Sequence, residues 1–144
     1  MVKTELCGLV SVIHRKTQIY LNSELKKYGL NSAEFVYLIH IREHEPTELK
    51  SLGAHLRMDD AQTTRVIKSL EEKGLVRKLR SRTDRRAFDV EFTQAGRDVK
   101  PLILEDLDRW VSGITEGLPE QEVEEMIRLL RQTAQRAVSL TEGK

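Results

Sequence analysis

The stretch from residue 59 to residue 92, DDAQTTRVIKSLEEKGLVRKLRSRTDRRAFDVEF, decides the fold. It opens with Asp59, a favoured helix-capping residue, and Gln62 follows three positions later, a spacing that indicates a helix start. Apolar residues then recur at helical spacing: Val66, Ile67 and Leu70. Gly74 marks the expected end of this helix, and two short β-type segments, LVRKL and AFDVEF, follow it. The stretch therefore predicts a helix that leads into a β-hairpin.

Upstream of this stretch the sequence predicts three further helices. A long first helix should end near Gly29, and Asn31 with Glu34 forms a capping-box pattern that opens a second helix. The buried side of that second helix should carry Phe35, Leu38 and Ile39. Thr47 is expected to cap a short third helix, which a tight turn at Arg57 separates from the helix after Asp59. Two short helices joined by a tight turn and followed by a hairpin are typical of a winged helix-turn-helix.

Downstream, Thr93 should cap a long fifth helix, and a last helix follows the GLPEQE turn. The apolar stripes of the first and last helices are too extensive for so small a winged domain to bury, which indicates self-association. The fold class expected is mainly α with a small β-hairpin wing, a winged helix-turn-helix domain plus dimerisation helices. One domain over residues 1–144 is expected, with the DNA-binding lobe at about 30–93 and the dimerisation helices at about 1–28 and 94–141.

The bulk composition describes one soluble domain whose charge is unevenly distributed. The 144 residues are 39% hydrophobic and 33% charged, with a net charge of +1. Residues 57–86 hold ten Lys and Arg against five Asp and Glu, whereas residues 87–144 hold seven against twelve. The chain has no apolar run of about 18 residues and no signal-peptide pattern, so a cytoplasmic protein without membrane contact is expected. A basic middle segment favours a polyanionic partner.

The outward face of the helix after Asp59 carries side chains that can read DNA bases. With Val66, Ile67 and Leu70 inside, helical geometry turns Ala61, Gln62, Arg65, Lys68 and Ser69 outward, with Thr63 to the side. Gln pairs with an adenine edge, Arg with guanine, and Thr or Ala contacts a thymine methyl group, while Lys suits a phosphate. Asp60 could accept a hydrogen bond from cytosine or could serve the helix N-terminus.

The segment from residue 47 to residue 97 resembles the core of the MarR family of transcriptional regulators. The resemblance includes the T-R…L-E-K-G-L-V-R segment, the D-R-R of the wing and the T-x-x-G-R that opens the next helix. It implies a homodimer that binds a pseudo-palindromic double-stranded DNA site with half-sites about 10 to 10.5 bp apart. It also implies that Asp84 orients Arg86 in the minor groove, with Arg82 and Arg85 as further minor-groove or phosphate contacts. The DNA-binding candidates are Asp60, Ala61, Gln62, Thr63, Arg65, Lys68, Arg82, Asp84, Arg85 and Arg86.

The resemblance further implies a repressor that a small, often aromatic or phenolic effector releases from DNA. A cleft for such an effector would draw on His14, Tyr37 and Trp110. Cys7 falls where the hydroperoxide-sensing branch of the family keeps its reactive cysteine, but the tyrosines of that branch fall here at Leu21 and Ser32. Redox sensing through Cys7 therefore competes with an ordinary packing role for this residue.

The remaining chemistry-bearing residues do not indicate an enzyme, a cofactor or a metal site. His40 and His44 are four residues apart, which can suit a metal on a helix, but two histidines are too few. The acidic segments EDLD and EQEVEE lie on outward helix faces with no nucleophile or phosphate loop beside them. The alternative from another class is a winged-helix module whose outward face docks onto a protein.

Overall fold

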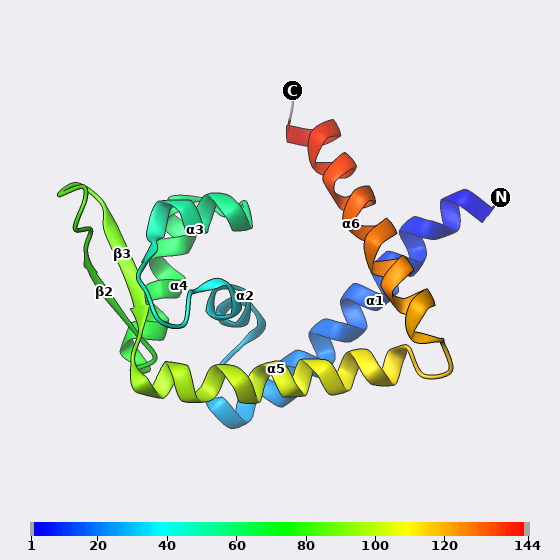
Figure 1. Cartoon of the computed structure of the whole chain (residues 1–144), viewed down its shortest axis with the longest axis horizontal. Coiled ribbons are helices and arrows are strands. Elements are labelled where there is room, and N and C mark those ends of the chain that lie inside the picture. Colours follow the sequence, from blue (N-terminus) through cyan, green and yellow to red (C-terminus); the bar gives the residue numbers. More distant parts are fainter. Residues whose placement is uncertain (1, 143–144) are drawn as a thin grey trace. The chain divides into compact units, whose positions relative to one another are not determined.

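Helices carry most of the chain, and one small sheet interrupts them (Figure 1). The computed structural model describes residues 2–142. It divides the chain into two units, Met1–Asp108 and Arg109–Lys144, and the boundary between them lies within a helix. The fold class predicted from the sequence, mainly α with a small wing, is confirmed.

The helices and the two hairpin strands follow the predicted order, and a 3-10 turn and a third strand are additional elements. The helices are α1 (Val2–Leu25), the short 3-10 turn η1 (Lys26–Tyr28), α2 (Ser32–His40), α3 (Leu49–Leu56), α4 (Asp60–Glu72), α5 (Gln94–Ile114) and α6 (Glu120–Glu142). The strands are β1 (Thr47–Glu48), β2 (Val76–Arg80) and β3 (Phe88–Phe92), arranged in the antiparallel order β1-β3-β2. Among the described residues, no helix is both long and apolar enough to cross a membrane.

Local capping signals account for the start of α2 and the end of the helical segment before it. Gly29 has a φ of 71° and closes η1, where glycine is favoured because it tolerates this left-handed conformation. The side chain of Asn31 accepts the backbone N–H of Glu34 at 2.9 Å, and the carboxylate of Glu34 accepts the backbone N–H of Asn31 at 3.0 Å. This reciprocal capping box is the one that the sequence predicted.

The prediction that Thr47 caps the third helix is wrong. Helix α3 begins at Leu49, and Thr47 instead lies in β1, where it pairs with Val90 of β3. Its hydroxyl oxygen accepts the backbone N–H of Arg42 at 3.0 Å. The residue that the sequence pattern predicted as a helix cap therefore belongs to strand β1.

The core of the first unit lies between α2, α4 and the sheet. Its fully buried apolar side chains come from α1, α2 and the residue that follows it, α4, both strands of the hairpin and α5: Leu25, Leu38, Ile41, Ile67, Leu70, Val76, Val90, Phe92 and Ile103. The aromatic ring of Phe35 and most of Tyr37 are also buried. Such close packing fixes how far each helix can rotate, because interior side chains leave few voids.

A buried carboxylate joins the end of α1 and η1 to α5. Asp106 is 3% exposed and accepts Lys27 Nζ at 3.1 Å and the Tyr28 hydroxyl at 3.0 Å. The hydrogen bond to Asp106 raises the pKa of Lys27 above its usual value. Burial, followed by the hydrogen bond to Asp106, raises the pKa of Tyr28. The backbone carbonyl of Asp106 also accepts the Tyr20 hydroxyl at 2.7 Å, so one residue holds three side chains of the preceding helical segment.

The wing passes into α5 through a close contact that requires glycine. Thr93 Oγ1 donates to the backbone carbonyl of Gly74 at 2.6 Å and accepts the backbone N–H of Gly96 at 3.2 Å. A Cβ atom on Gly96 would collide with the backbone carbonyl of Leu75 and would lie 2.5 Å from the ring of Phe92. The T-x-x-G-R motif therefore has a physical reason, because its threonine caps α5 and its glycine leaves room for the backbone of Leu75, between α4 and β2.

Gly96→Ala is expected to lower the free energy of unfolding by about 1 to 3 kcal/mol, because the added methyl group overpacks a backbone contact that cannot yield. Gly113→Ala is the matched control in the same helix, since a Cβ there meets nothing within 4 Å. The control should raise stability by about 0.5 to 1 kcal/mol through helix propensity. Chemical denaturation of both variants measures the difference, and equal stabilities would contradict the contact.

Candidate nucleic-acid interface

Helix α4 presents one polar face to solvent. Asp59 caps it by accepting the backbone N–H of Gln62 at 2.7 Å, as the sequence predicted. Ile67 and Leu70 are 1% and 0% exposed and anchor the inner face. The side chains left exposed on α4 beyond its first residue include Ala61, Thr64, Arg65 and Lys68, whereas Gln62 and Ser69 are half-buried. The outward face therefore combines base-reading and phosphate-binding residue types.

Thr63 does not belong to this outward face, and its prediction as a DNA-binding residue is corrected. Thr63 is 3% exposed, and its hydroxyl oxygen lies 3.0 Å from the hydroxyl of Tyr37. A side chain buried in this way cannot reach a base edge. The neighbouring Thr64 is exposed and takes the place that the sequence gave to Thr63.

The turn between α3 and α4 is held by backbone contacts. Arg57 adopts a left-handed conformation with a φ of 57°, and the backbone N–H of Met58 donates to the carbonyl of Gly53 at 2.9 Å. Gly53 faces Thr63 so closely that a Cβ on it would lie 2.7 Å from Thr63 Oγ1. The absence of a side chain on Gly53 lets α3 and α4 approach each other, which is what a helix-turn-helix requires.

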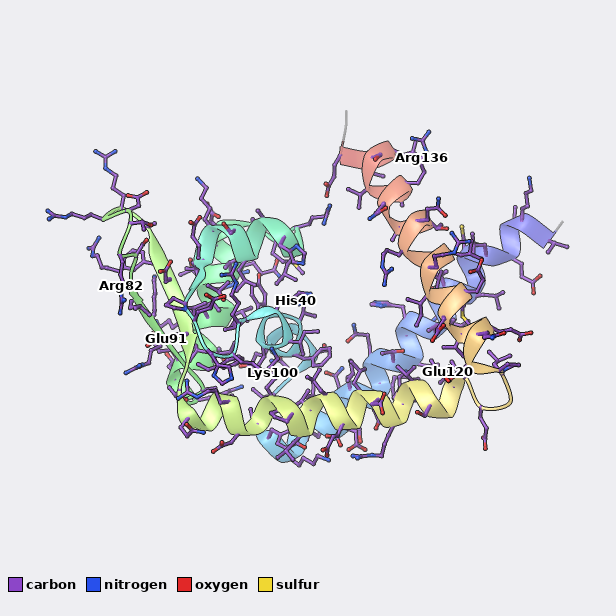
Figure 2. The ribbon with its side chains drawn as sticks, in the orientation of Figure 1. His40, Arg82, Glu91, Lys100, Glu120 and Arg136 are labelled. Atoms are coloured by element: carbon purple, nitrogen blue, oxygen red, sulfur yellow. The ribbon has the colours of Figure 1, made fainter. Side chains whose placement is uncertain are left out.

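The wing is a hairpin whose loop projects away from α5 (Figure 1), and Figure 2 shows polar side chains extending from it near the labelled Arg82. Its strands pair from Val76 opposite Phe92 to Arg80 opposite Phe88. Asp84 Oδ1 accepts the backbone N–H of Arg86 at 2.9 Å, and the backbone carbonyl of Asp84 accepts the N–H of Ala87 at 3.0 Å. The carboxylate therefore shapes the turn through the backbone of Arg86. The arginine side chains of the loop are exposed: Arg82, Arg85 and Arg86.

Two cations that the sequence analysis did not select support the wing from its strands. Lys78 Nζ lies 4.3 Å from the centre of the Phe88 ring, and the guanidinium carbon of Arg80 lies 5.0 Å from it. Arg80 Nη1 also donates to the backbone carbonyl of Arg85 at 2.6 Å. Strand alternation in LVRKLR would have placed Lys78 and Arg80 on one face, and Phe88 lies directly opposite Arg80.

Residues of α3, α4 and the wing line a hollow of about 340 Å³. It gathers four of the predicted residues, Asp60, Thr63, Asp84 and Arg86, beside residues of α3 and β3 that the sequence did not select. Its lining also includes Glu48, Leu49, Lys50, Thr64, Ala87 and Phe88. The start of α4 and the tip of the wing thus belong to one continuous surface.

The predicted effector residues differ in their exposure. Tyr37 is 1% exposed and hydrogen-bonded to Thr63, and its role as a cleft residue stays a prediction. His14 is exposed on α1, and Trp110 lies in the second unit. Cys7 is an exposed free cysteine on α1, and its redox role stays a prediction.

The paired histidines do not share a helical face. Helix α2 ends at His40, so His44 lies beyond it, and the ring of His40 instead lies 5.2 Å from the ring of His55. Across residues 2–142, no group of three or more His, Cys, Asp or Glu side chains is placed to hold a metal ion.

Comparison with known proteins identifies this arrangement. The family model described as MarR family matches residues 30–88, the segment that contains α2 to the start of β3. The HTH-type transcriptional regulator BilQ of Clostridioides difficile (strain CD3) is 27% identical over 125 residues, which cover 87% of this chain and 84% of BilQ. The segment from α2 to the start of β3 is thus similar to the MarR family. The relative BilQ is described as an HTH-type transcriptional regulator.

Solved structures support the same fold. A MarR transcriptional regulator from Methanosarcina mazei Go1 superposes with a TM-score of 0.87 at 22% identity, covering 96% of this chain and 99% of that one. The structure of reduced AbfR bound to DNA superposes with a TM-score of 0.72 at 24% identity, covering 95% of this chain and 94% of that one. Both similarities extend over the helices on either side of the wing as well as the lobe.

Thr63→Val is expected to lower the free energy of unfolding by about 1 to 3 kcal/mol, because it leaves the buried Tyr37 hydroxyl without its partner. Thr64→Val is the matched control one residue later, and it should change stability by no more than about 0.5 kcal/mol because Thr64 is exposed. Urea denaturation measures both. A larger effect at Thr64 than at Thr63 would contradict the assignment of inner and outer positions.

Proposed function

We propose that this protein is a sequence-specific double-stranded DNA-binding regulator that acts as a homodimeric repressor. The observation that carries the proposal is the single surface formed by α4 and the wing. Arg65 and Lys68 are exposed on α4, and Arg82, Arg85 and Arg86 are exposed on the wing loop. An exposed helix face suits the major groove, and an arginine-rich hairpin tip suits an adjacent minor groove, where a narrow A·T-rich segment strengthens the negative potential.

The charges on this surface favour a nucleic acid over a protein partner. The single carboxylate of Asp84 cannot balance the charge of the three exposed loop arginines, and one of its oxygens accepts the backbone N–H of Arg86. Cations directed at phosphates release counterions, so DNA affinity falls steeply as salt rises. A winged-helix module that docks onto a protein would show no comparable dependence on salt or preference among duplexes.

Exposed apolar side chains on the helices outside the lobe support the homodimer. On α1, Leu6, Leu9, Val10 and Ile13 are all more than 45% exposed. None of the described residues of α6 is buried, although Met126, Ile127 and Leu130 repeat on one face. Apolar stripes of this extent on a single chain indicate an interface, and a second copy is the partner that the family resemblance implies.

The repressor role and its control are the finer part of the proposal. A dimer seated on an operator that overlaps a promoter blocks transcription, and a small aromatic or phenolic effector would release it. Support for this step comes from the family resemblance rather than from an assembled effector cleft. Redox sensing through Cys7 is the alternative to release by an effector. It is tested by measuring DNA binding of wild type and Cys7→Ser after peroxide treatment, since equal loss of DNA binding would exclude Cys7 as the sensor.

Selection from a random duplex pool at moderate salt is expected to return a pseudo-palindromic site. With that site, Arg86→Ala should weaken binding and reduce the slope of log affinity against log salt by about 2 per dimer, because one phosphate or groove contact is lost from each half-site. Gln62→Ala should change the preferred base at one position per half-site, at a cost of about 1 to 3 kcal/mol in discrimination.

Arg128→Ala serves as the control, because Arg128 is paired with Glu125 on α6, outside the lobe. It should leave the affinity and the salt slope unchanged. A selection that enriches no sequence, or an affinity indifferent to salt, would contradict DNA binding as the function.

Ile127→Glu is expected to shift the protein from dimer to monomer, because it places an unpaired carboxylate in the proposed apolar interface. Gln132→Glu, on the opposite side of α6 by helical geometry, adds the same charge at an exposed position and should leave the dimer intact. Sedimentation equilibrium at micromolar concentration measures both variants. A wild-type protein that sediments as a monomer would contradict the homodimer.

A further inference from the structure

We propose that Glu34, which does not touch the DNA-binding face, is a positioning residue that sets the pose of α4. Through Ser69 and Lys73 it fixes the rotation of α4, and with it the direction of Thr64, Arg65 and Lys68. This inference rests on the proposed DNA-binding function and deepens it. The sequence analysis recognised Glu34 only as a capping residue, and nothing in the composition indicates a link to the opposite end of the helix-turn-helix.

The carboxylate of Glu34 is buried and its two oxygens are fully occupied. Glu34 is 2% exposed. Its Oε1 accepts the backbone N–H of Asn31 at 3.0 Å and Lys73 Nζ at 2.7 Å. Its Oε2 accepts the hydroxyl of Ser69 at 2.7 Å and Lys73 Nζ at 2.7 Å. A buried carboxylate that accepts four close hydrogen bonds from three donor groups has one well-defined orientation.

The partners of Glu34 lie on the last turn of α4. Lys73 is the C-terminal cap of this helix, and its backbone N–H donates to the carbonyl of Ser69 at 3.1 Å. The Lys73 side chain is 35% exposed, so its ammonium group keeps partial contact with water while it contacts Glu34. A cation at this position also complements the negative end of the helix dipole. The contact therefore holds the C-terminal end of α4 against α2.

A second side chain of α2 holds the other end of α4. The Tyr37 hydroxyl lies 3.0 Å from Thr63 Oγ1, near the start of α4. Glu34 and Tyr37 are three residues apart and so lie on the same face of α2. Between these two polar contacts, apolar side chains such as Ile67 and Leu70 anchor α4.

The two kinds of contact constrain α4 differently. Burial of apolar surface is not directional, so it opposes separation of the helices more strongly than rotation of one about its axis. Hydrogen bonds weaken steeply when their angles are distorted, so a contact at each end of α4 opposes such rotation. Base readout depends on side-chain direction, and a small rotation moves Arg65 and Lys68 relative to the base edges. Glu34 is placed to preserve that direction.

Glu34→Gln tests the proposal, because glutamine can still accept from Asn31 through Oε1 in a capping box and can donate to the Ser69 hydroxyl through Nε2, but it loses the charge that attracts Lys73. The ratio of affinity for the selected site to affinity for random duplex should fall by about tenfold, the scale of one charged hydrogen bond. Affinity for random duplex and the salt slope should not fall, because no cation has been removed. Glu125→Gln, which breaks an exposed ion pair with Arg128 on α6, is the matched control and should leave the ratio unchanged.

Lys73→Met distinguishes a positioning role from a direct DNA contact, and it replaces Glu34→Gln as the test if that variant does not fold. If Lys73 acts as a positioning partner, Lys73→Met should lower the ratio of affinity for the selected site to affinity for random duplex, as Glu34→Gln does, and leave the salt slope unchanged. A salt slope reduced by about 2 per dimer in Lys73→Met, with a normal ratio in Glu34→Gln, would assign Lys73 to a phosphate and overturn the proposal. An unchanged ratio in both variants, with only a lowered melting temperature, would reduce Glu34 to a stabilising role and overturn it also.

Amide hydrogen exchange in the absence of DNA distinguishes failure of this inference from failure of the proposed function. The peptide covering the last two turns of α4 should exchange faster in Glu34→Gln than in wild type, whereas peptides from α6 should not change. Unchanged exchange in α4 would overturn the contact as a constraint, whatever the DNA result. Faster exchange in α4 together with a wild type that selects no duplex would uphold the constraint and refute the DNA-binding function.

Discussion

The close approach of α3 and α4 at Gly53 is the constraint on which the rest of the lobe depends. Any side chain at Gly53 would meet Thr63 Oγ1, which itself bonds to Tyr37. Three helices therefore meet at one buried polar point, and the inward direction of Thr63 determines which residues of α4 face outward. The DNA-facing surface is thus specified by a contact that lies behind it, and the apolar residues Ile67 and Leu70 follow the same inward face.

In the wing, cationic side chains rather than buried apolar ones hold the loop in place. Lys78 and Arg80 lie over the ring of Phe88, and Arg80 also donates to the backbone carbonyl of Arg85. These contacts fix the base of the loop, so its exposed arginines extend from an ordered ribbon rather than from a mobile charged run. Desolvation by an approaching duplex would strengthen such cation–π contacts, because they are weakest when fully hydrated. A net charge of +1 for the whole chain conceals this local order.

The sequence predicted those features that depend on neighbours in the chain. The capping box of Asn31 and Glu34, the left-handed Gly29 and the order of helices and strands follow from local rules of this kind. The errors arise where a distant segment competes. Thr47 pairs with β3 instead of capping a helix, because a sheet partner is not visible in local sequence. Thr63 and Thr64 are adjacent in sequence, and only the packing against Tyr37 decides which of them is buried. Periodicity alone cannot place a residue at the edge of an amphipathic face.

Two buried carboxylates at the junction of α1 and α2 illustrate what lies beyond sequence patterns. Asp106 binds Lys27 and Tyr28 from α5, and Glu34 binds Ser69 and Lys73 of α4, so the short connection between α1 and α2 is held at both ends by charged groups. Burying a carboxylate carries a desolvation cost that its partners only offset, so such pairs add little net stability over well-packed apolar residues. These pairs instead fix the orientation of the helices that carry them, because the partner side chains must reach a fixed pair of carboxylate oxygens. The connection between the helices proposed to dimerise and the helix proposed to read DNA is therefore built from contacts that specify orientation.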